Sequence, residues 1–244
     1  MLAAGVALVV ATSLTACQST QGRSAELEAQ GATKLLSESG VEIGRESTEV
    51  KVTSTTLLTD VNGSAVVVGL HNGSSENLVD VPILIEVLDA KGKSVYANDT
   101  PGIEPALASV PYIPGKGDAE WVNDQVLASG QPKSVKVKVG TSHASHSGPL
   151  PEVVVFKPTI EGDPASGLEA TGTVVNRTGE EQGRLLLYAI GRRGGKVVAA
   201  GRGAIEHLKP TTKPLHYSVF FIGNPRGTDL EVTDFPALPG SEPE

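Results

Sequence analysis

Ser134-Val135-Lys136-Val137-Lys138-Val139 is the clearest structural signal in the chain, because apolar and charged residues alternate along it without interruption. Successive side chains of a β-strand point to opposite faces, so this order places valine on one face and lysine on the other. The pattern predicts a strand whose valines face a hydrophobic core and whose lysines face water.

Upstream of this stretch, from residue 48, other segments rich in valine, leucine and isoleucine show a similar strand-like texture. We expect strands at residues 50–58, 64–70, 81–88, 93–96 and 119–122. Asp89-Ala90-Lys91-Gly92 lies between two of them and predicts a tight hairpin turn in which Gly92 supplies the positive φ. Trp121 is expected to be a core residue.

A second series of segments repeats the first after about 100 residues, the size of one immunoglobulin-like sandwich. Its members are residues 153–160, 168–175, 182–190, 196–200, 215–221 and 230–235, with a turn at 191–195. Asn72 and Asn176 follow matching segments 104 residues apart, and Lys93 and Lys196 follow matching turns 103 residues apart. The chain is therefore predicted to be all-β, with two tandem immunoglobulin-like β-sandwiches.

The residues around the expected hairpins carry a family resemblance. Ile85-Glu86-Val87-Leu88-Asp89-Ala90-Lys91-Gly92-Lys93 and, with a longer turn and without the Asp, Leu187-Tyr188-Ala189-Ile190-Gly191 resemble the FxLYD-type immunoglobulin-like repeats of bacterial envelope lipoproteins. The match covers about half of each repeat and consists of structural positions. It implies a fold and offers no catalytic residues.

The segment from Leu2 to Ala16 is apolar and uncharged, as in a signal peptide, and is too short to span a bilayer comfortably. Leu14-Thr15-Ala16-Cys17 resembles the lipobox of bacterial lipoproteins, which implies that Cys17 carries a lipid and becomes the first mature residue. The alternative is an incidental small buried thiol at Cys17. A basic residue normally opens a signal peptide and none precedes Cys17, so we hypothesise that the true start lies upstream of Met1.

These patterns divide the chain into segments of different character. The expected organisation is a signal peptide and lipobox (1–17), a flexible tether (18–47), a first sandwich (48–140), a linker (141–151), a second sandwich (152–238) and a tail (239–244). The tether is assigned because its residues are polar and lack aromatic side chains.

Composition limits the classes of partner and of fold. The net charge is -8, which lacks the basic character of a nucleic-acid binder, so membrane contact is assigned to the lipid on Cys17. A single cysteine, once lipidated, leaves no disulfide, so each sandwich depends on its hydrophobic core. Richness in valine, alanine and glycine suggests an actinobacterial source.

Catalytic and metal motifs are sparse. The chain has no Gly-x-Ser-x-Gly, and the glycines of residues 191–195 lack the Lys-Ser/Thr ending of a phosphate loop. We therefore expect no enzyme activity, no catalytic residues and no cofactor. His143 and His146 are the candidates for a metal site, but no carboxylate or thiol lies nearby in the sequence, and the alternative is a pair of solvated linker histidines.

Two features are candidates for binding. The first is the Pro-rich segment from residue 98 to residue 117, because long loops in compact domains tend to be functional. Its candidate residues are Pro101, Ile103, Leu107, Tyr112 and Ile113. The alternative is an elongated edge that crosses between two sheets.

The second feature is a basic cluster at the expected second hairpin. Arg192 and Arg193 are its central members, with Arg184, Lys196 and Arg202 around them. It could meet an anionic wall polymer or an acidic partner, or else its charges blunt an exposed strand edge.

Together these observations predict a lipoprotein of the cell envelope, anchored to the cell membrane on its extracytoplasmic face. We expect a non-catalytic binding or scaffold module whose partners are the membrane, through Cys17, and an envelope protein or cell-wall polymer. The alternatives are a solute- or metal-binding lipoprotein and a cell-envelope hydrolase. Four asparagines match the glycosylation pattern formally, but in a bacterial lipoprotein a turn at each is the better explanation; they are Asn62, Asn72, Asn98 and Asn176.

Overall fold

The computed structural model describes residues 40–142 and 144–238, which belong to one compact unit. They form sixteen β-strands and one 3₁₀ turn, η1 (Pro105–Leu107), and no α-helix occurs among them. The predicted all-β class is confirmed. None of the described segments forms a helix that could cross a membrane. Cys17, His143, most of the predicted tether and the predicted tail lie outside the described residues.

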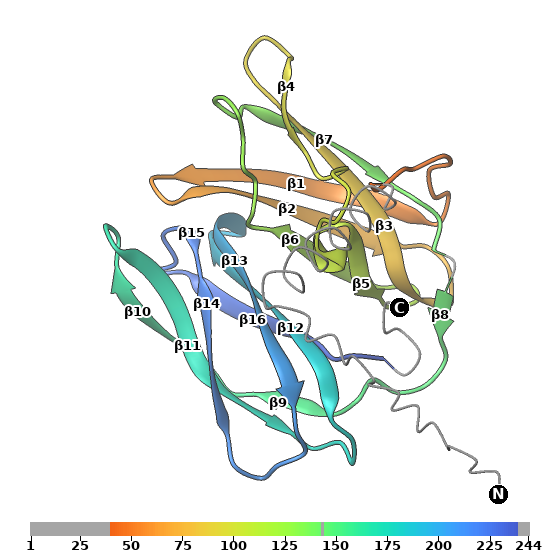
Figure 1. Ribbon diagram of the computed structural model, residues 1–244, viewed down its shortest axis with the longest axis vertical. Helices are drawn as coiled ribbons and strands as arrows, with labels where there is room; N and C mark the ends of the chain where they lie inside the picture. Colours follow the sequence, from red (N-terminus) through yellow and green to blue (C-terminus); the bar gives the residue numbers. More distant parts are fainter. Residues whose placement is uncertain (1–39, 143, 239–244) are drawn as a thin grey trace, which may run out of the picture. The chain divides into compact units, whose positions relative to one another are not determined.

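The first half of the described chain contains two antiparallel sheets (Figure 1). One has the order β1-β2-β6, made of β1 (Val50–Asp60), β2 (Gly63–Asn72) and β6 (Asp118–Asn123). The other is centred on β3 (Asn77–Leu88), which pairs with β4 (Ser94–Ala97), β5 (Ser109–Ile113), β7 (Ser134–Val139) and β8 (Ala144–His146). In β7 the three lysine and serine side chains are exposed and the three valines are partly or fully buried, so the predicted alternation is confirmed.

The second half also contains two antiparallel sheets. One has the order β10-β11-β14, made of β10 (Thr159–Asp163), β11 (Gly167–Asn176) and β14 (Leu215–Phe220), with β9 (Val153–Val155) also paired to β11. The other has the order β15-β13-β12-β16, made of β12 (Gln182–Arg193), β13 (Lys196–Leu208), β15 (Ile222–Gly223) and β16 (Asp229–Phe235).

The two halves share a strand-pairing scheme. The hairpin β1–β2 with β6 on its far side corresponds to the hairpin β10–β11 with β14 on its far side. Likewise β3 lies between β4 and β7, as β12 lies between β13 and β16. The strands of the two halves are therefore paired in an equivalent order.

Asn72 and Asn176 make equivalent hydrogen bonds in the two halves. Each is at most 1% exposed and follows the second strand of its half. The Asn72 Oδ1 accepts hydrogen bonds from Ser74, and its Nδ2 donates to the Glu76 carbonyl at 2.7 Å. Asn176 makes the same set of hydrogen bonds. Its Oδ1 accepts from Thr178, and its Nδ2 donates to the Glu180 carbonyl. These two side chains therefore hold turns, as predicted. Asn98, for which a turn was also predicted, is instead fully buried and makes hydrogen bonds with the backbone of β3 and η1.

The predicted hairpin at Asp89-Ala90-Lys91-Gly92 is present between β3 and β4. The Asp89 Oδ1 accepts from the backbone N–H groups of Lys91 and Lys93 at 2.8 and 2.9 Å. Gly92 has φ +78°, a conformation that costs glycine little and other residues more.

Three expectations about element boundaries differ from the structure. The expected strand 153–160 is two strands, β9 and β10, separated around Pro158. The predicted linker 141–151 is in part a strand, because β8 pairs with β3. At the end of the predicted tether, Ser47 donates its N–H to the Val139 carbonyl and so joins the first half.

The two halves pack against each other through the sheet that contains β12. In β12, Leu185, Leu187 and Ala189 belong to the core of the second half, whereas Leu186, Tyr188 and Ile190 belong to a core shared with the first half. Strands β13 and β15 contact β1 and β2, as Figure 1 shows. Since each fully buried aliphatic side chain stabilises a fold by about 1.5–3 kcal/mol, this shared core joins the halves strongly.

Candidate functional site

An ion-pair cluster lies where the two halves meet, and Glu104 is its centre. Glu104 comes just before η1 in the first half. Arg202, on β13, donates from Nη1 and Nη2 to both carboxylate oxygens of Glu104 at 2.5 and 2.7 Å. Arg184, on β12, donates to the same carboxylate. The Arg202 side chain is only 5% exposed, so this pairing is buried.

The electrostatics of Glu104 follow from these contacts. Burial by itself would raise the pKa of the Glu104 carboxyl, but the hydrogen bonds and positive charges of Arg202 and Arg184 outweigh burial and lower that pKa. Conversely, burial would lower the pKa of Arg202, and the carboxylates of Glu104 and Asp124 raise it instead. Glu104 and Arg202 are therefore held in their charged forms.

Asp124 extends the cluster on the side of the first half. Its Oδ2 accepts a hydrogen bond from the Arg202 backbone N–H at 2.9 Å, and its Oδ1 lies 3.5 Å from the Arg202 Nε. Burial raises the pKa of the Asp124 carboxyl, despite the opposing effect of Arg202. Tyr188, directly across from Arg202 in the β12–β13 ladder, has a buried hydroxyl with no hydrogen-bond partner among the described residues.

Arg192 forms a second bridge between the halves. It donates from Nη2 to Glu120 on β6 and lies 3.2 Å from Glu231 on β16 through Nη1. Its neighbour Arg193 is exposed and donates to the Arg226 carbonyl at 2.8 Å. Of the predicted basic cluster, Arg184, Arg192 and Arg202 thus meet acidic residues of their own chain.

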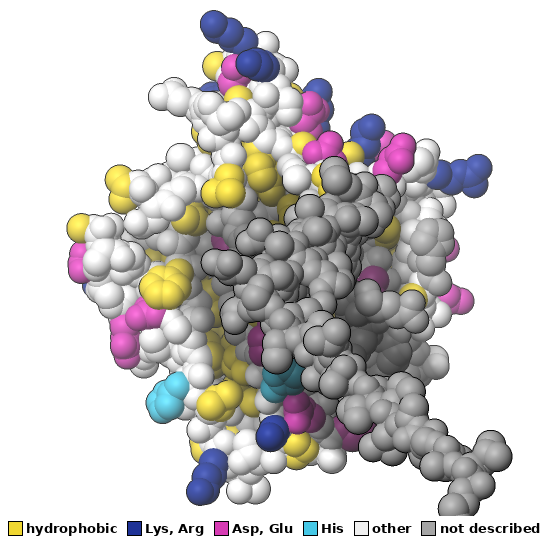
Figure 2. Space-filling view, viewed as in Figure 1, with side chains coloured by type: hydrophobic (Ala, Val, Ile, Leu, Met, Phe, Trp, Pro, Cys, Tyr) yellow, Lys and Arg dark blue, Asp and Glu magenta, His cyan; other side chains and the backbone are white. Residues whose placement is uncertain are grey.

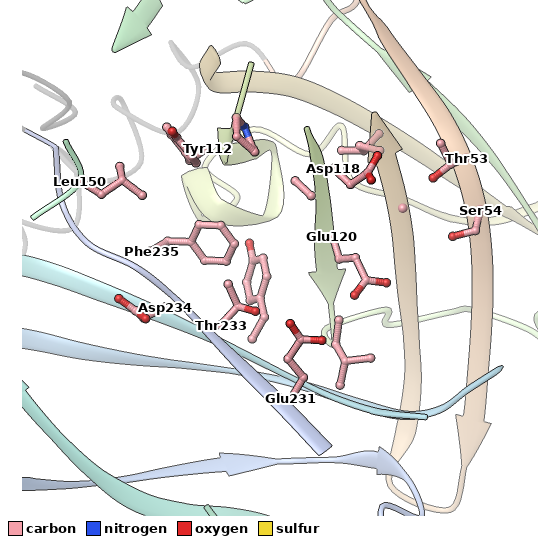
Figure 3. Close-up of a pocket in the computed structure, with 16 residues that line it drawn as sticks. Thr53, Ser54, Tyr112, Asp118, Glu120, Leu150, Glu231, Thr233, Asp234 and Phe235 are labelled. Atoms are coloured by element: carbon pink, nitrogen blue, oxygen red, sulfur yellow. The ribbon is translucent and has the colours of Figure 1, made fainter. Parts of the chain in front are cut away.

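A cleft of about 510 Å³ opens beside Arg192, between the halves (Figure 3). One wall comes from β1, β2, β6 and the end of β5, and the other comes from β12 and β16. Figure 3 shows the carboxylates of Glu120 and Glu231 reaching toward each other from these opposite walls, while Tyr112 and Phe235 lie toward the other end. The cleft combines acidic, hydroxyl and aromatic side chains, which suits non-covalent binding of a ligand.

A smaller cavity of about 300 Å³ also involves Phe235. It is lined mainly by apolar residues, with three ionisable side chains, Asp80, Arg184 and His207. Burial raises the pKa of the Asp80 carboxyl. Asp80 and His207 both have positive φ, at 49° and 55°.

The predicted binding residues of the Pro-rich segment do not lie together in one site. Tyr112 lines the cleft, while Leu107 and Ile113 are 2% and 0% exposed and therefore form core. Ile103 is half-buried and Pro101 is exposed. The segment is not one long loop, because it contains η1 and β5. Its other notable role is to carry Glu104 to the interface.

The core prediction for Trp121 is confirmed, because the ring is fully buried and its Nε1 donates to the Ala106 carbonyl at 3.0 Å. Of the two histidines predicted as metal candidates, His146 lies in β8, with its Nε2 3.3 Å from the Pro149 carbonyl. Among residues 40–142 and 144–238, no group of three or more His, Cys, Asp or Glu side chains is arranged to hold a metal.

Sequence reasoning did not find Glu120, Glu231, Tyr188 or Phe235 as residues of a common site. One signal was available for Tyr188: it lies in the unbroken apolar run from Leu185 to Ile190, and such a run indicates a strand buried on both faces. That pattern would have placed a second layer of protein against β12.

Comparison of the chain with protein-family models, with curated proteins and with solved structures finds no match.

Proposed function

We propose that the chain is a lipid-anchored protein of the cell envelope that binds its partner non-covalently in the cleft between its two halves. The cleft is the observation that carries this proposal. Its volume of about 510 Å³ lies within the range of about 300–1,000 Å³ typical of ligand sites, and two packed halves supply its walls. Ligand sites occur preferentially at such junctions.

Each half is proposed to be an immunoglobulin-like β-sandwich. The support is the strand order, in which a hairpin and a later strand make one sheet while the strands between and after them make the other. The buried Asn72 and Asn176 at equivalent places support a common origin for the halves. The test is a crystal structure in which the two halves are superposed. We expect β1–β7 to match β10–β16, and a mismatch of the two sheets would refute the proposal.

The anchor is proposed from the lipobox-like Leu14-Thr15-Ala16-Cys17. Two or more acyl chains give stable membrane attachment, a condition that a lipoprotein meets. We expect cells fed radiolabelled palmitate to label the native protein and not a Cys17→Ala variant. Equal labelling of both, or of neither, would contradict the anchor.

Binding in the cleft is tested with the lipidated protein on intact cells, using one blocked variant and one matched control. Thr233, on β16, is exposed and lines the cleft, so Thr233→Trp fills part of the space. Thr159, on β10, is exposed on a sheet outside the cleft, so Thr159→Trp adds the same bulk elsewhere. Crosslinking should recover one partner with the native and Thr159→Trp proteins and lose it with Thr233→Trp. Equal recovery with both variants would place binding elsewhere.

A further inference from the structure

We propose that the cleft between the halves takes a small organic cation, an amine that carries an apolar or aromatic body. This inference rests on the proposed function and deepens it, because it names the chemical class of the ligand. Three observations carry it: the charge of the lining, the free carboxylate oxygens and the aromatic side chains in the walls.

Apart from two tyrosines, every ionisable side chain in the lining of the cleft is a carboxylate. They are Asp118, Glu120, Glu231 and Asp234, and the lining contains no lysine, arginine or histidine. Arg192, next to the cleft, compensates only part of this charge, through Glu120 and Glu231. On the part of the face in Figure 2 that is not drawn in grey, lysine and arginine side chains are interspersed with acidic ones. An excess of negative charge remains in the cleft and attracts cations.

Two of these carboxylates keep an oxygen available. Arg192 approaches Oε2 of Glu231, and His71 approaches Oδ1 of Asp118 at 2.7 Å. The second oxygen of each has no hydrogen-bond partner in the part of the chain that the structure describes. The Glu231 and Asp118 side chains are 66% and 80% exposed, so an ammonium group can reach them from solvent.

Three aromatic rings contribute to the apolar part of the lining, together with the aliphatic residues Leu70, Pro114, Ala119, Leu150 and Ile190. Tyr188 and Phe235 pack with their ring centroids 4.8 Å apart and their planes tilted by 55°, and Tyr112 comes from the opposite wall. The face of an aromatic ring attracts a cation, and the same rings pack against an apolar body. A simple metal ion has no apolar body to pack against these rings, so the lining favours an organic cation.

Tyr188 contributes to the cleft through its ring alone. It lines the cleft, is 1% exposed, and its hydroxyl has no hydrogen-bond partner among residues 40–142 and 144–238. The hydroxyl is enclosed beside the charges of Arg202, Glu104 and Asp124 and does not open into the cleft, so a ligand would meet the ring of Tyr188 and not its hydroxyl.

The test compares three small molecules that share one apolar body, using isothermal titration calorimetry on the full chain. The molecules are 4-phenylbutylamine, 4-phenylbutanol and 4-phenylbutyrate, which are cationic, neutral and anionic at pH 7. We expect the amine to bind at least about tenfold more tightly than the alcohol, and the carboxylate more weakly still. Binding of the amine should weaken as salt is raised, because the carboxylates of the cleft are partly exposed.

Variants then place the bound amine. Glu231→Gln should weaken amine binding about five- to tenfold and leave binding of the alcohol unchanged, and Asp118→Asn serves the same purpose if the first variant does not fold. Thr233→Trp should abolish binding of both. Glu161→Gln, on the exposed face of β10, removes an equal charge outside the cleft and should change nothing.

The outcomes separate this inference from the proposed function. If the alcohol or the carboxylate binds as tightly as the amine and Thr233→Trp abolishes that binding, the cleft is a binding site and the cation inference is wrong. If none of the three molecules binds, or if Thr233→Trp leaves amine binding intact, the assignment of a small-molecule site to this cleft is wrong as well.

Discussion

Replacing Arg202 by methionine tests the interface between the halves most sharply, because the substitution removes a buried charge and keeps much of the side-chain volume. Arg202 donates hydrogen bonds to both carboxylate oxygens of Glu104 and also contacts Asp124. Glu104 and Asp124 belong to the first half, and Arg202 belongs to the second. Its loss leaves two carboxylates of low exposure, 24% and 16%, with only Arg184 still beside Glu104.

Breaking a buried ion pair by removing one partner costs about 3–5 kcal/mol, since the other charge is left uncompensated. Because Glu104 keeps Arg184 and some contact with water, we expect the lower end, a loss of about 3 kcal/mol in the free energy of unfolding. For a protein of this size the loss corresponds to a fall in Tm of roughly 6–12 °C.

The assay is urea unfolding followed by the fluorescence of Trp121 and by circular dichroism. Removing both charges in Glu104→Gln/Arg202→Met should cost less than the sum of the single variants, with a coupling of about 1–3 kcal/mol. Arg177→Met is the control, since its pair with Glu152 is 55% and 66% exposed and should contribute at most about 1 kcal/mol. A loss below about 1 kcal/mol for Arg202→Met, or strict additivity in the double variant, would refute the reasoning.

Three further predictions concern single buried groups. Asn176→Ala should lower the free energy of unfolding in urea by about 2–3 kcal/mol, because it leaves buried backbone groups unpaired. The control is Asn62→Ala at an exposed position, which should change the free energy of unfolding by less than about 0.5 kcal/mol. Equal effects of the two substitutions would contradict this prediction. Tyr188→Phe in the ligand-free protein should leave Tm unchanged or raise it, because it removes a hydroxyl without a partner among the described residues; a clear fall in Tm would show a partner. The pKa of Glu104 is lowered by folding, so its contribution to stability is complete above the ordinary carboxyl pKa of 4.5 and is lost as pH falls through the lowered value. Stability should therefore fall less steeply below pH 4.5 in Glu104→Gln than in the native protein, and parallel curves would contradict this.

Local patterns in the sequence predicted much of the secondary structure. The alternation of Val135, Val137 and Val139 with lysine gave the strand and its buried face, and Gly92 marked the hairpin correctly. Both features depend on neighbouring residues alone, because strand period and turn geometry are local properties.

Strand β5 was missed because Pro111 interrupts it. Proline cannot donate a ladder hydrogen bond and argues against a strand, yet the register of β5 with β3 continues on both sides of Pro111. Pairing on either side keeps the strand in place, and no local rule foresees that.

The interface between the halves could not be assembled from the sequence. Arg192 and Glu120 are 72 positions apart, and Arg202 and Glu104 are 98 apart, so their pairing follows from how one half packs on the other. Spacing within a strand contains no information about that packing. Only the unbroken apolar run from Leu185 to Ile190 indicated that β12 has a buried second face.

The cleft, and with it the proposed function, exists only if the two halves pack as one unit. Differential scanning calorimetry of the native protein measures this directly, by comparing the calorimetric enthalpy of unfolding with the van't Hoff enthalpy. The shared core of Leu186, Tyr188 and Ile190 with the first half predicts one transition in which the two enthalpies agree. Two separate transitions, each with the enthalpy of about half the chain, would contradict the account.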